Sequence, residues 1–372
     1  MFDPDARLRA VTLLGQSLWL DYIRRDELRN GALARRIERG QVRGVTSNPT
    51  IFMKAITGSE VYRPAIESLA RQGLSAEAIF EHLAVEDIQA ACDLFRPLYD
   101  RTHGLDGFVS LEVSPYLARD TQATVRAALR LWERVARPNL MIKIPGTREG
   151  LPAIVEALAA GVNVNVTLLF SVERYRVVME AYLTALERRL EAGQPLDAVV
   201  SVASFFVSRV DTLVDRRLEE IGTPEALALR GKIAVANAKM AYQAFKEVFS
   251  GERFARLAAH GARVQRPLWA STSTKNPAYS DIKYVEELIG PHTVNTVPPH
   301  TLAAFADHGE PRLTLEARLE EAAAALEALP NLGIDLAQVT DELERAGVDA
   351  FAQAYAALLQ AIDQVRGGGN GG

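Results

Sequence analysis

The sequence alternates short β-rich runs with longer amphipathic stretches, and this alternation occurs eight times. Helical patterns such as Arg119–Arg137 and Val172–Ala192 follow the β-rich runs. Strands that alternate with helices are expected to be parallel and joined by right-handed crossovers. Eight such units in 372 residues predict an α/β fold of the (β/α)8 TIM-barrel type. The predicted strands are Ser17–Tyr22, Gly44–Asn48, Phe108–Val113, Leu140–Ile144, Val162–Leu168, Ala198–Ser204, Pro267–Ser271 and Thr293–Val297.

An open, doubly wound sheet is the alternative fold for such an alternation. That fold needs a glycine-rich phosphate loop at its switch point. The sequence contains neither G-x-G-x-x-G nor the Walker pattern G-x-x-x-x-G-K-[ST]. The barrel is therefore favoured, and a nucleotide-binding loop is not expected.

Two regions exceed a minimal barrel. Residues Ser59–His103 predict two or three extra helices after the second strand, and Leu313–Val365 is rich in Ala, Leu and Glu with a helical period. We expect this C-terminal stretch to pack as helices on the barrel. The chain is thus predicted to form one barrel domain over 1–366 with a C-terminal helical extension, followed by a flexible tail over 367–372.

Charge and composition exclude several partners and cofactors. The net charge of −5 without a basic block argues against nucleic-acid binding, and any anionic substrate must be held by a few local cations. The six histidines are scattered and form no ligand pair, so no metal site is expected. No apolar stretch is long enough to span a membrane. The sequence leaves open whether the protein forms a homo-oligomer.

The cytoplasm is the expected location. The single cysteine, Cys92, excludes an internal disulfide and fits a reducing compartment. The first residues, Met1–Asp5, lack the basic start and apolar run of a secretory signal.

One lysine stands inside a predicted buried strand. Lys143 lies in Leu140–Thr147 (LMIKIPGT), between apolar residues and before a Pro-Gly pair that ends the run. Burial penalises the charged ammonium, and a neutral amine in a dry pocket can attack a carbonyl to form a Schiff base. An isolated lysine of this kind more often snorkels to water or pairs with an acid.

Polar residues also end most of the other predicted strands. In a (β/α)8 barrel the carboxyl ends of the strands meet at one mouth, where function resides. Each residue alone has a structural explanation, but together they predict a site around Lys143, because buried polar groups are costly unless paired. These residues are Asp21, Asn48, Glu112, Asn165, Thr167, Ser204 and Ser271, with Arg209 and Lys275 just beyond.

The residue types suggest a division of roles. Glu112 is the natural carboxylate near Lys143, Thr167 could fix a water between them, and Asp21 is placed to take a proton from a substrate hydroxyl. Hydroxyl and amide side chains, in Asn48, Asn165 and Ser204, suit a polyhydroxylated substrate. Arg209, Lys275 and Ser271 suit a terminal phosphate. Phe206 shares a strand face with Ser204 and is expected to border the intermediate held on the lysine.

With these motifs the chain resembles the transaldolases. The matching stretches keep their order and spacing over most of the predicted barrel. They are Gly44–Phe52 (GVTSNPTIF), Leu111–Asp120 (LEVSPYLARD), Met141–Gly150 (MIKIPGTREG), Asn163–Ser171 (NVNVTLLFS) and Ser204–Asp211 (SFFVSRVD).

The resemblance implies a Schiff-base barrel without metal or organic cofactor. The implied reaction moves a dihydroxyacetone unit from sedoheptulose 7-phosphate to glyceraldehyde 3-phosphate, giving erythrose 4-phosphate and fructose 6-phosphate. Carried over, Lys143 is the Schiff-base lysine, Glu112 and Thr167 work with the catalytic water, and Asp21 is the acid/base. The long C-terminal part resembles the longer bacterial branch.

One stretch departs from the family pattern. Many transaldolases carry Ala-Ser-Phe-Arg-Asn at the seventh strand, whereas here Ala270-Ser271 leads into Thr272-Ser273-Thr274-Lys275-Asn276. The second phosphate cation is therefore Lys275, or it comes from elsewhere in the chain.

Three other functions remain as alternatives. A fructose 6-phosphate aldolase-like lyase would use the same lysine and release free dihydroxyacetone. A barrel that only binds sugar phosphate would be expected to lack the lysine or its acid/base partners, which are all present. Pyridoxal-phosphate chemistry on Lys143 would give a visible absorbance.

Overall fold

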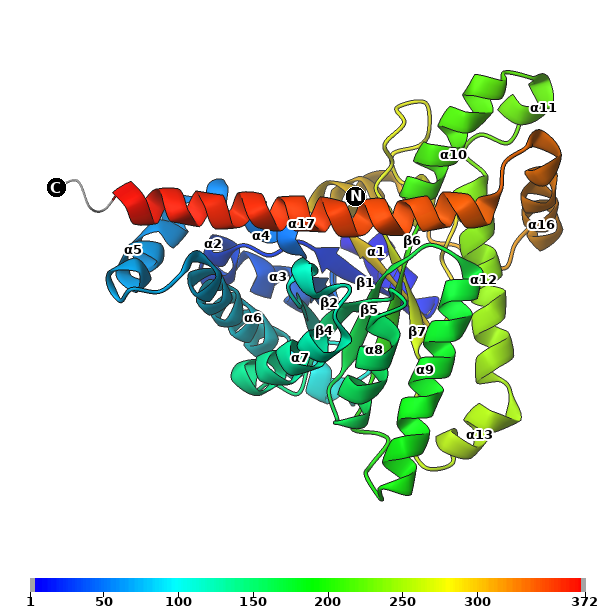
Figure 1. Ribbon diagram of the computed structural model, residues 1–372. Coiled ribbons are helices and arrows are strands. Elements are labelled where there is room, and N and C mark those ends of the chain that lie inside the picture. The colour runs from blue at the N-terminus through cyan, green and yellow to red at the C-terminus, as the bar shows by residue number, and fades with distance from the viewer. Residues whose placement is uncertain (1–3, 369–372) are drawn as a thin grey trace.

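The computed structural model describes residues 4–368 and shows eight parallel strands closed into a barrel. Each strand pairs with the next along the chain, and β8 closes the barrel by pairing with β1 (Figure 1). The strands are β1 (Gln16–Asp21), β2 (Gly44–Thr46), β3 (Phe108–Glu112), β4 (Leu140–Pro145), β5 (Val164–Leu169), β6 (Ser201–Phe206), β7 (Arg266–Ala270) and β8 (Thr293–Val297). The predicted (β/α)8 barrel is confirmed.

Helices surround the barrel and fill the connections between its strands. Three short 3-10 turns accompany them: η1 (Glu60–Tyr62), η2 (Pro115–Leu117) and η3 (Pro330–Leu332). The α-helices are α1 (Pro4–Leu13), α2 (Arg25–Arg29), α3 (Ala32–Glu38), α4 (Pro49–Thr57), α5 (Arg63–Arg71), α6 (Ala76–Arg101), α7 (Thr121–Val135), α8 (Gly150–Ala159), α9 (Val172–Glu191), α10 (Ser208–Ile221), α11 (Pro224–Leu227), α12 (Ile233–Phe249), α13 (Glu252–Ala258), α14 (Lys283–Glu286), α15 (Pro299–His308), α16 (Leu319–Ala328) and α17 (Leu336–Gly368).

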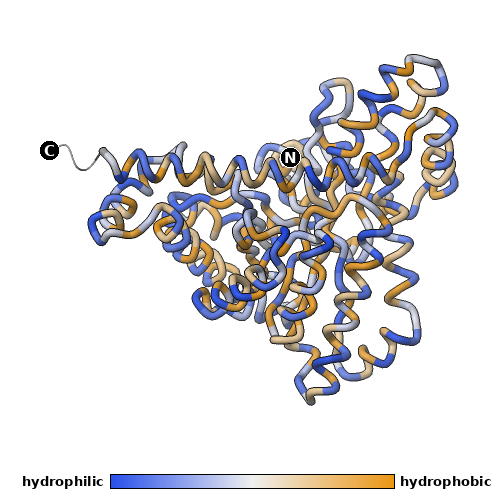
Figure 2. Tube along the Cα trace, in the orientation of Figure 1, coloured by the Kyte–Doolittle hydropathy of each residue, from blue (hydrophilic) through white to orange (hydrophobic). Residues whose placement is uncertain are grey.

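Local signals fix where several of these helices begin. Ser171 caps α9, because its hydroxyl accepts a hydrogen bond from the Arg174 backbone N–H at 3.1 Å. Asp120 caps α7 in the same way, through the Ala123 N–H at 2.9 Å. Hydrophobic and hydrophilic residues alternate along the helices (Figure 2), so each outer helix can pack on the barrel and still face solvent.

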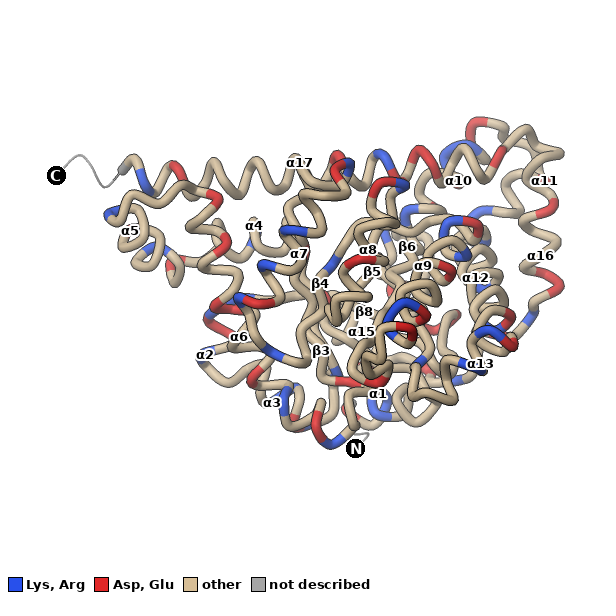
Figure 3. Tube along the Cα trace, turned by 60° about the horizontal axis from the view of Figure 1, so that its bottom comes forward, with Lys and Arg blue, Asp and Glu red and all other residues tan. Residues whose placement is uncertain are grey.

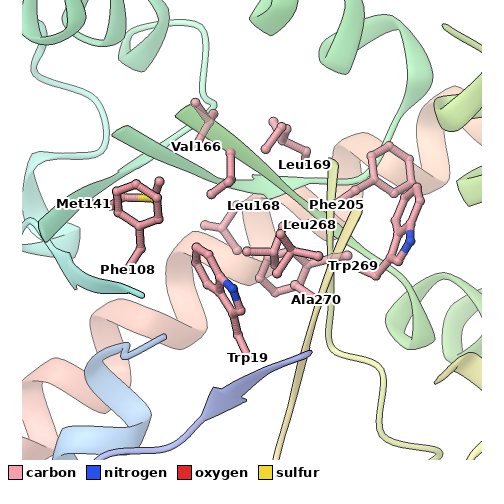
Figure 4. Packing of buried hydrophobic residues seen from close by; sticks show 14 of the residues in the cluster. Trp19, Phe108, Met141, Val166, Leu168, Leu169, Phe205, Leu268, Trp269 and Ala270 are labelled. Carbon is pink, nitrogen blue, oxygen red and sulfur yellow. The ribbon is translucent and has the colours of Figure 1, made fainter. Parts of the chain in front are cut away.

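Strand residues are buried on both faces, as expected for a parallel sheet covered by helices. Figure 4 shows large side chains packed beside the strands, among them Trp19 and Phe108, whose ring centroids lie 6.3 Å apart. A Cβ on Gly44 would lie 2.7 Å from the Trp19 ring. The start of β2 therefore needs a glycine to let Trp19 pack against it.

Acidic and basic residues intermingle over the outer helices (Figure 3), in keeping with a net charge of only −5 in 372 residues. Within residues 4–368, no helix is both long enough and apolar enough to cross a membrane.

The extra helices predicted from the sequence are present. The segment after β2 forms η1, α5 and the 26-residue helix α6. The C-terminal stretch forms α16, η3 and the 33-residue helix α17, which includes Gly367 and Gly368. The remaining residues of the predicted tail, 369–372, lie outside the described residues.

Helix α17 runs straight across the barrel mouth (Figure 1). It contacts α10 on one side and α4, α5 and α6 on the other, and it also touches β5 between them. The helix therefore forms a roof over the strand ends where the site was predicted.

Candidate active site

A cavity of about 420 Å³ opens at the carboxyl ends of the strands, beneath α17. The ends of several strands and the loops after them form its wall, and α17 contributes Phe351. Nine of the eleven residues predicted from the sequence line it: Asp21, Asn48, Lys143, Thr167, Ser204, Phe206, Arg209, Ser271 and Lys275.

Lys143 lies in the middle of β4 and points to the cavity floor. Its Nζ donates a hydrogen bond to the Ser47 carbonyl oxygen at 3.0 Å and lies 3.1 Å from Oε2 of Glu112. The Lys143 side chain is 5% exposed and that of Glu112 is 3% exposed. Glu112 on β3 and Lys143 on β4 are direct register partners, so the sheet itself sets this ion pair.

Glu112 and Thr167 offer unused oxygen atoms next to this lysine. Burial raises the pKa of Glu112, while the ammonium of Lys143 opposes the rise. Among the described residues, Glu112 Oε1 and Thr167 Oγ1 are buried and have no hydrogen-bond partner. Polar atoms of this kind are costly to bury unless a ligand or water engages them. Both oxygens are therefore available to a substrate or water at Lys143.

Thr167 sits at an irregularity in β5. The pairing of β5 with β6 shifts register between Val166 and Leu169, and Leu168 has a φ of 61°. Such bulges re-aim side chains at the rims of barrels. The irregularity accompanies the turn of the chain at Thr167, whose hydroxyl lines the cavity.

Asp21 ends β1 and lines the cavity, whereas Glu112 does not line it and reaches the site through its ion pair with Lys143. Thr46 Oγ1 donates a hydrogen bond to Oδ1 of Asp21 at 2.6 Å. Burial raises the pKa of Asp21, and this rise is opposed first by the Thr46 hydrogen bond and then by the positive charges of Lys143, Lys275 and Arg209. The site thus holds two carboxyls whose pKa values are raised by burial.

Three polar residues predicted to contact a polyol have different surroundings. Asn48 lines the cavity and also caps α4, accepting the Ile51 N–H at 2.9 Å. Ser204 lines the cavity and donates to Asn165 Oδ1 at 2.7 Å. Asn165 itself does not line the cavity, and its Nδ2 donates to Ser110 Oγ at 3.1 Å. Asn165 therefore orients Ser204 from behind the wall.

Cations gather on one side of the cavity. The Arg209 guanidinium lies 5.4 Å from the Phe206 ring centroid, and burial lowers its pKa. Lys275 donates to Ser273 Oγ, and its pKa is lowered by burial and by the charges of Arg209 and Lys54. These cations form an anion-binding wall. A bound phosphate would offset the repulsion between the neighbouring positive charges and accept hydrogen bonds from them.

Ser271 joins this wall from the end of β7. Its Oγ lies 3.0 Å from Ser208 Oγ, and its φ of 54° is unusual for a residue other than glycine. The strained backbone turns the chain out of β7 toward the loop that carries Lys275.

Some cavity residues were not predicted from the sequence. Lys54 follows the GVTSNPTIF stretch by two positions, so its place on α4 just after a strand end was a usable signal. His300 is the second residue of α15, the helix after β8, and could have been found in the same way. Phe351 stands 208 residues after Lys143 in a helical stretch with no motif, and nothing in the sequence links the two.

Residues 4–368 contain no group of three or more His, Cys, Asp or Glu side chains that could hold a metal ion. The cavity instead presents an amine, one carboxyl, hydroxyls and cations, and the Glu112 carboxyl is paired with the amine. Such a set suits covalent and acid/base chemistry on an anionic polyol.

Comparison with known proteins agrees with this chemistry. The sequence profile of the family described as Transaldolase/Fructose-6-phosphate aldolase matches residues 18–362. A protein of Parafrankia sp. named transaldolase is 51% identical over 361 residues, covering 97% of this chain and 98% of the relative. The transaldolase of Thermobifida fusca is 52% identical over 358 residues, covering 96% and 97%. That of Mycolicibacterium smegmatis is 51% identical over 355 residues, covering 95% and 96%. The chain belongs to the transaldolase/fructose-6-phosphate aldolase family.

Proposed function

We propose that the protein is a transaldolase that works through a Schiff base on Lys143. The family and its relatives support an enzyme that transfers aldehyde or ketone residues. The proposed reaction transfers a dihydroxyacetone unit from sedoheptulose 7-phosphate to glyceraldehyde 3-phosphate and yields erythrose 4-phosphate and fructose 6-phosphate. The observation that carries the proposal is the buried amine of Lys143, 3.1 Å from Glu112 in a site that includes Asp21.

The first step forms the Schiff base. The neutral Nζ of Lys143 attacks the ketone carbon of the donor, and the resulting carbinolamine loses its hydroxyl as water. Glu112 transfers the protons for this step, and Thr167 holds the water between them. The unused oxygens of both side chains support these roles.

The second step breaks a carbon–carbon bond. Asp21 takes the proton from the hydroxyl two carbons beyond the imine carbon, and the electrons of the broken bond move to the iminium nitrogen. The first aldehyde product leaves, and an enamine remains on Lys143. The enamine carbon then attacks the carbonyl carbon of an acceptor aldehyde, and Asp21 returns its proton to the new hydroxyl. Water finally cleaves the new imine with the help of Glu112.

The remaining residues bind the sugar phosphate. Arg209, Lys275 and Ser271 hold the phosphate at the cation-lined side of the cavity. Hydroxyl and amide groups of Asn48 and Ser204, with Asn165 behind them, bind the substrate hydroxyls. Phe206 forms an apolar wall next to the enamine. This mechanism uses no metal and no organic cofactor.

Cellular context is a further part of the proposal. We propose the cytoplasm, because the only cysteine of the chain is Cys92, a buried free thiol whose pKa is raised by burial. The acidic net charge supports small sugar phosphates, rather than nucleic acid, as the ligands. The whole of 1–366 is proposed to act as one domain, because α17 completes the wall of the site.

A fructose 6-phosphate aldolase-like lyase is the second candidate, since the description of the family names both activities. Product analysis with fructose 6-phosphate separates the two. A transaldolase forms sedoheptulose 7-phosphate when erythrose 4-phosphate is added and releases little free dihydroxyacetone without it. A lyase releases dihydroxyacetone at a similar rate with and without the acceptor, and that result would overturn the proposal.

A further inference from the structure

Helix α17 is fastened on both sides of the barrel mouth. Near its start, Glu342 pairs with Arg217 of α10 at 2.6 Å and Glu344 pairs with Arg174 of α9 at 3.5 Å. Farther along, Leu358 is fully buried, and α17 packs against α4, α5 and α6. The middle of α17 is therefore held over the cavity at a fixed height.

One face of this middle segment points into the barrel. Gly347, Phe351 and Tyr355 are spaced four residues apart, so they share a helix face. A Cβ on Gly347 would lie 2.9 Å from Cδ2 of Leu168, so the glycine lets α17 approach β5 closely. The Tyr355 ring packs edge-on against Phe80 with centroids 5.6 Å apart. These contacts fix Phe351 between them, above the strand ends.

Phe351 covers the reacting nitrogen. Its side chain is buried, with 4% of the residue exposed, and lines the cavity. The Nζ of Lys143 lies 5.9 Å from the centroid of its ring. Nζ also contacts two polar groups, the Ser47 carbonyl oxygen and the Glu112 carboxylate. The ring is thus an apolar cover on the side from which α17 closes the site.

We propose that Phe351 is a specificity-determining residue that shields the covalent intermediate on Lys143 from water. The inference rests on the proposed function and adds a residue from outside the barrel to it. An apolar ring neither donates a proton nor holds a water, so the enamine survives until an acceptor aldehyde arrives.

The reaction that Phe351 suppresses is hydrolysis of the intermediate. The enamine carbon takes a proton from solvent and becomes the iminium of dihydroxyacetone. One water adds to the iminium carbon, the carbon–nitrogen bond breaks, and free dihydroxyacetone and the amine of Lys143 are released. The sequence consumes one water and needs no other reactant. Its rate depends on how easily water reaches the imine carbon.

The test measures how the intermediate partitions. With fructose 6-phosphate as donor, the release of free dihydroxyacetone is compared with transfer to erythrose 4-phosphate on the same sample. We expect Phe351→Ala to raise the ratio of release to transfer by about tenfold. Phe351→Leu keeps an apolar cover and should stay near the wild-type ratio. Phe351→Val should fall between them, and it decides the question if the alanine variant does not fold.

Leu358→Ala is the matched control. Leu358 is buried in the same helix but does not line the cavity, so its truncation should lower the melting temperature and leave the ratio unchanged. An unchanged ratio in Phe351→Ala and Phe351→Val, or an equal rise in Leu358→Ala, overturns the inference. Borohydride trapping of the wild-type adduct is run in parallel. If no adduct forms on Lys143 in the wild type, the proposed function fails; if it forms and the ratio does not move, only the role of Phe351 fails.

Discussion

Two buried carboxylates serve Lys143, and different elements hold them. Glu112 is tied to Lys143 by strand register, whereas Asp21 approaches from β1 and is held by Thr46. Burial raises the pKa of both carboxyls. Lys143 opposes the rise at both, and at Asp21 the Thr46 hydrogen bond and two further cations oppose it as well. The geometry therefore supports separate roles for them in imine chemistry and in carbon–carbon cleavage.

Alanine variants of the two carboxylates should fail at different steps. Asp21→Ala should still form the Schiff base but stall before cleavage, so that trapped adduct accumulates. Glu112→Ala should slow both formation and hydrolysis of the imine. Turnover should fall by about 10²–10⁴-fold in each, the usual scale for losing a general acid or base. Rapid-quench trapping with borohydride checks this, and equal, small losses in both variants would refute the separate roles.

The hydrogen bond from Thr46 should set the acid side of the pH–rate profile. It stabilises the ionised form of Asp21, and that form is the one that accepts a proton. Thr46→Val removes the bond, so the pKa of Asp21 rises further and the acid limb of the kcat–pH profile should move to higher pH. Thr296→Val removes the hydroxyl next to Thr46 but leaves the bond to Asp21, and it should shift the profile less. A profile unmoved by Thr46→Val would contradict the assignment of Asp21.

Phosphate recognition should depend on Arg209. Arg209→Ala is expected to raise KM for phosphorylated sugars far more than for unphosphorylated analogues, because its guanidinium lies on the cation-lined side of the cavity. Lys275→Ala gives the same comparison for the lysine in the loop after β7. If KM rises equally for phosphorylated and unphosphorylated substrates, Arg209 has only a structural role in the cavity wall.

At the scale of single residues, the sequence was most informative where chemistry and strand ends coincide. Lys143, Asp21 and Thr167 could be found because polar side chains are rare in buried strands and need a reason. Asn165 has a structural role, because it forms hydrogen bonds with Ser110 and Ser204 behind the cavity wall. Phe351 could not be found, because an apolar residue on a helix is ordinarily packing.

At the scale of elements, the eight strands were predictable because buried parallel strands are short, apolar runs bounded by turns. The start of β6 differs from the prediction. Residues before Ser201 form a turn in which the Val199 N–H donates to the Leu196 carbonyl at 3.4 Å, so the β-rich composition begins earlier than the strand. Amino-acid composition indicates only that a residue favours the β conformation. The strand itself begins where a neighbouring strand is close enough to form hydrogen bonds with it.

A buried carboxyl clamps α10 to the elements outside the barrel. Asp211 accepts hydrogen bonds from the Ala234 N–H at 2.7 Å and from the Tyr284 hydroxyl at 2.8 Å. Burial raises its pKa to about 6, and the two hydrogen bonds oppose the rise. The folded state therefore holds a proton that the unfolded chain releases near its ordinary value of 3.8.

This linkage predicts how stability changes with pH. The stability that this proton contributes is fully present below the unfolded-state pKa and is lost as the pH rises through about 6. The loss lowers the free energy of unfolding by about 3 kcal/mol. Asp211→Asn cannot titrate and does not lose this contribution. The free energy of unfolding of the variant, minus that of the wild type, should therefore increase between pH 4.5 and pH 7.5. Denaturant unfolding at several pH values measures the difference. Parallel curves for the two proteins would show that Asp211 does not titrate in this range.

At the scale of the whole molecule, the protein is a barrel with a helical roof. The barrel was predictable from alternation alone, but the position of α17 was not, because helical periodicity gives a helix and not the surface on which it packs. Its ion pairs with α9 and α10 and its apolar anchor at the other end appear only in the folded chain. The roof brings the last part of the sequence into a site that is otherwise built from strand ends.

In the proposed mechanism, every step depends on a covalent intermediate at Lys143. Borohydride reduction in the presence of fructose 6-phosphate, followed by peptide mass mapping, tests it directly. We expect a single adduct on the peptide that contains Lys143, and no adduct in Lys143→Arg, since arginine keeps its charge and cannot supply a neutral amine. An adduct on Lys54, Lys232 or Lys275 instead, or unchanged turnover in Lys143→Arg, would contradict it.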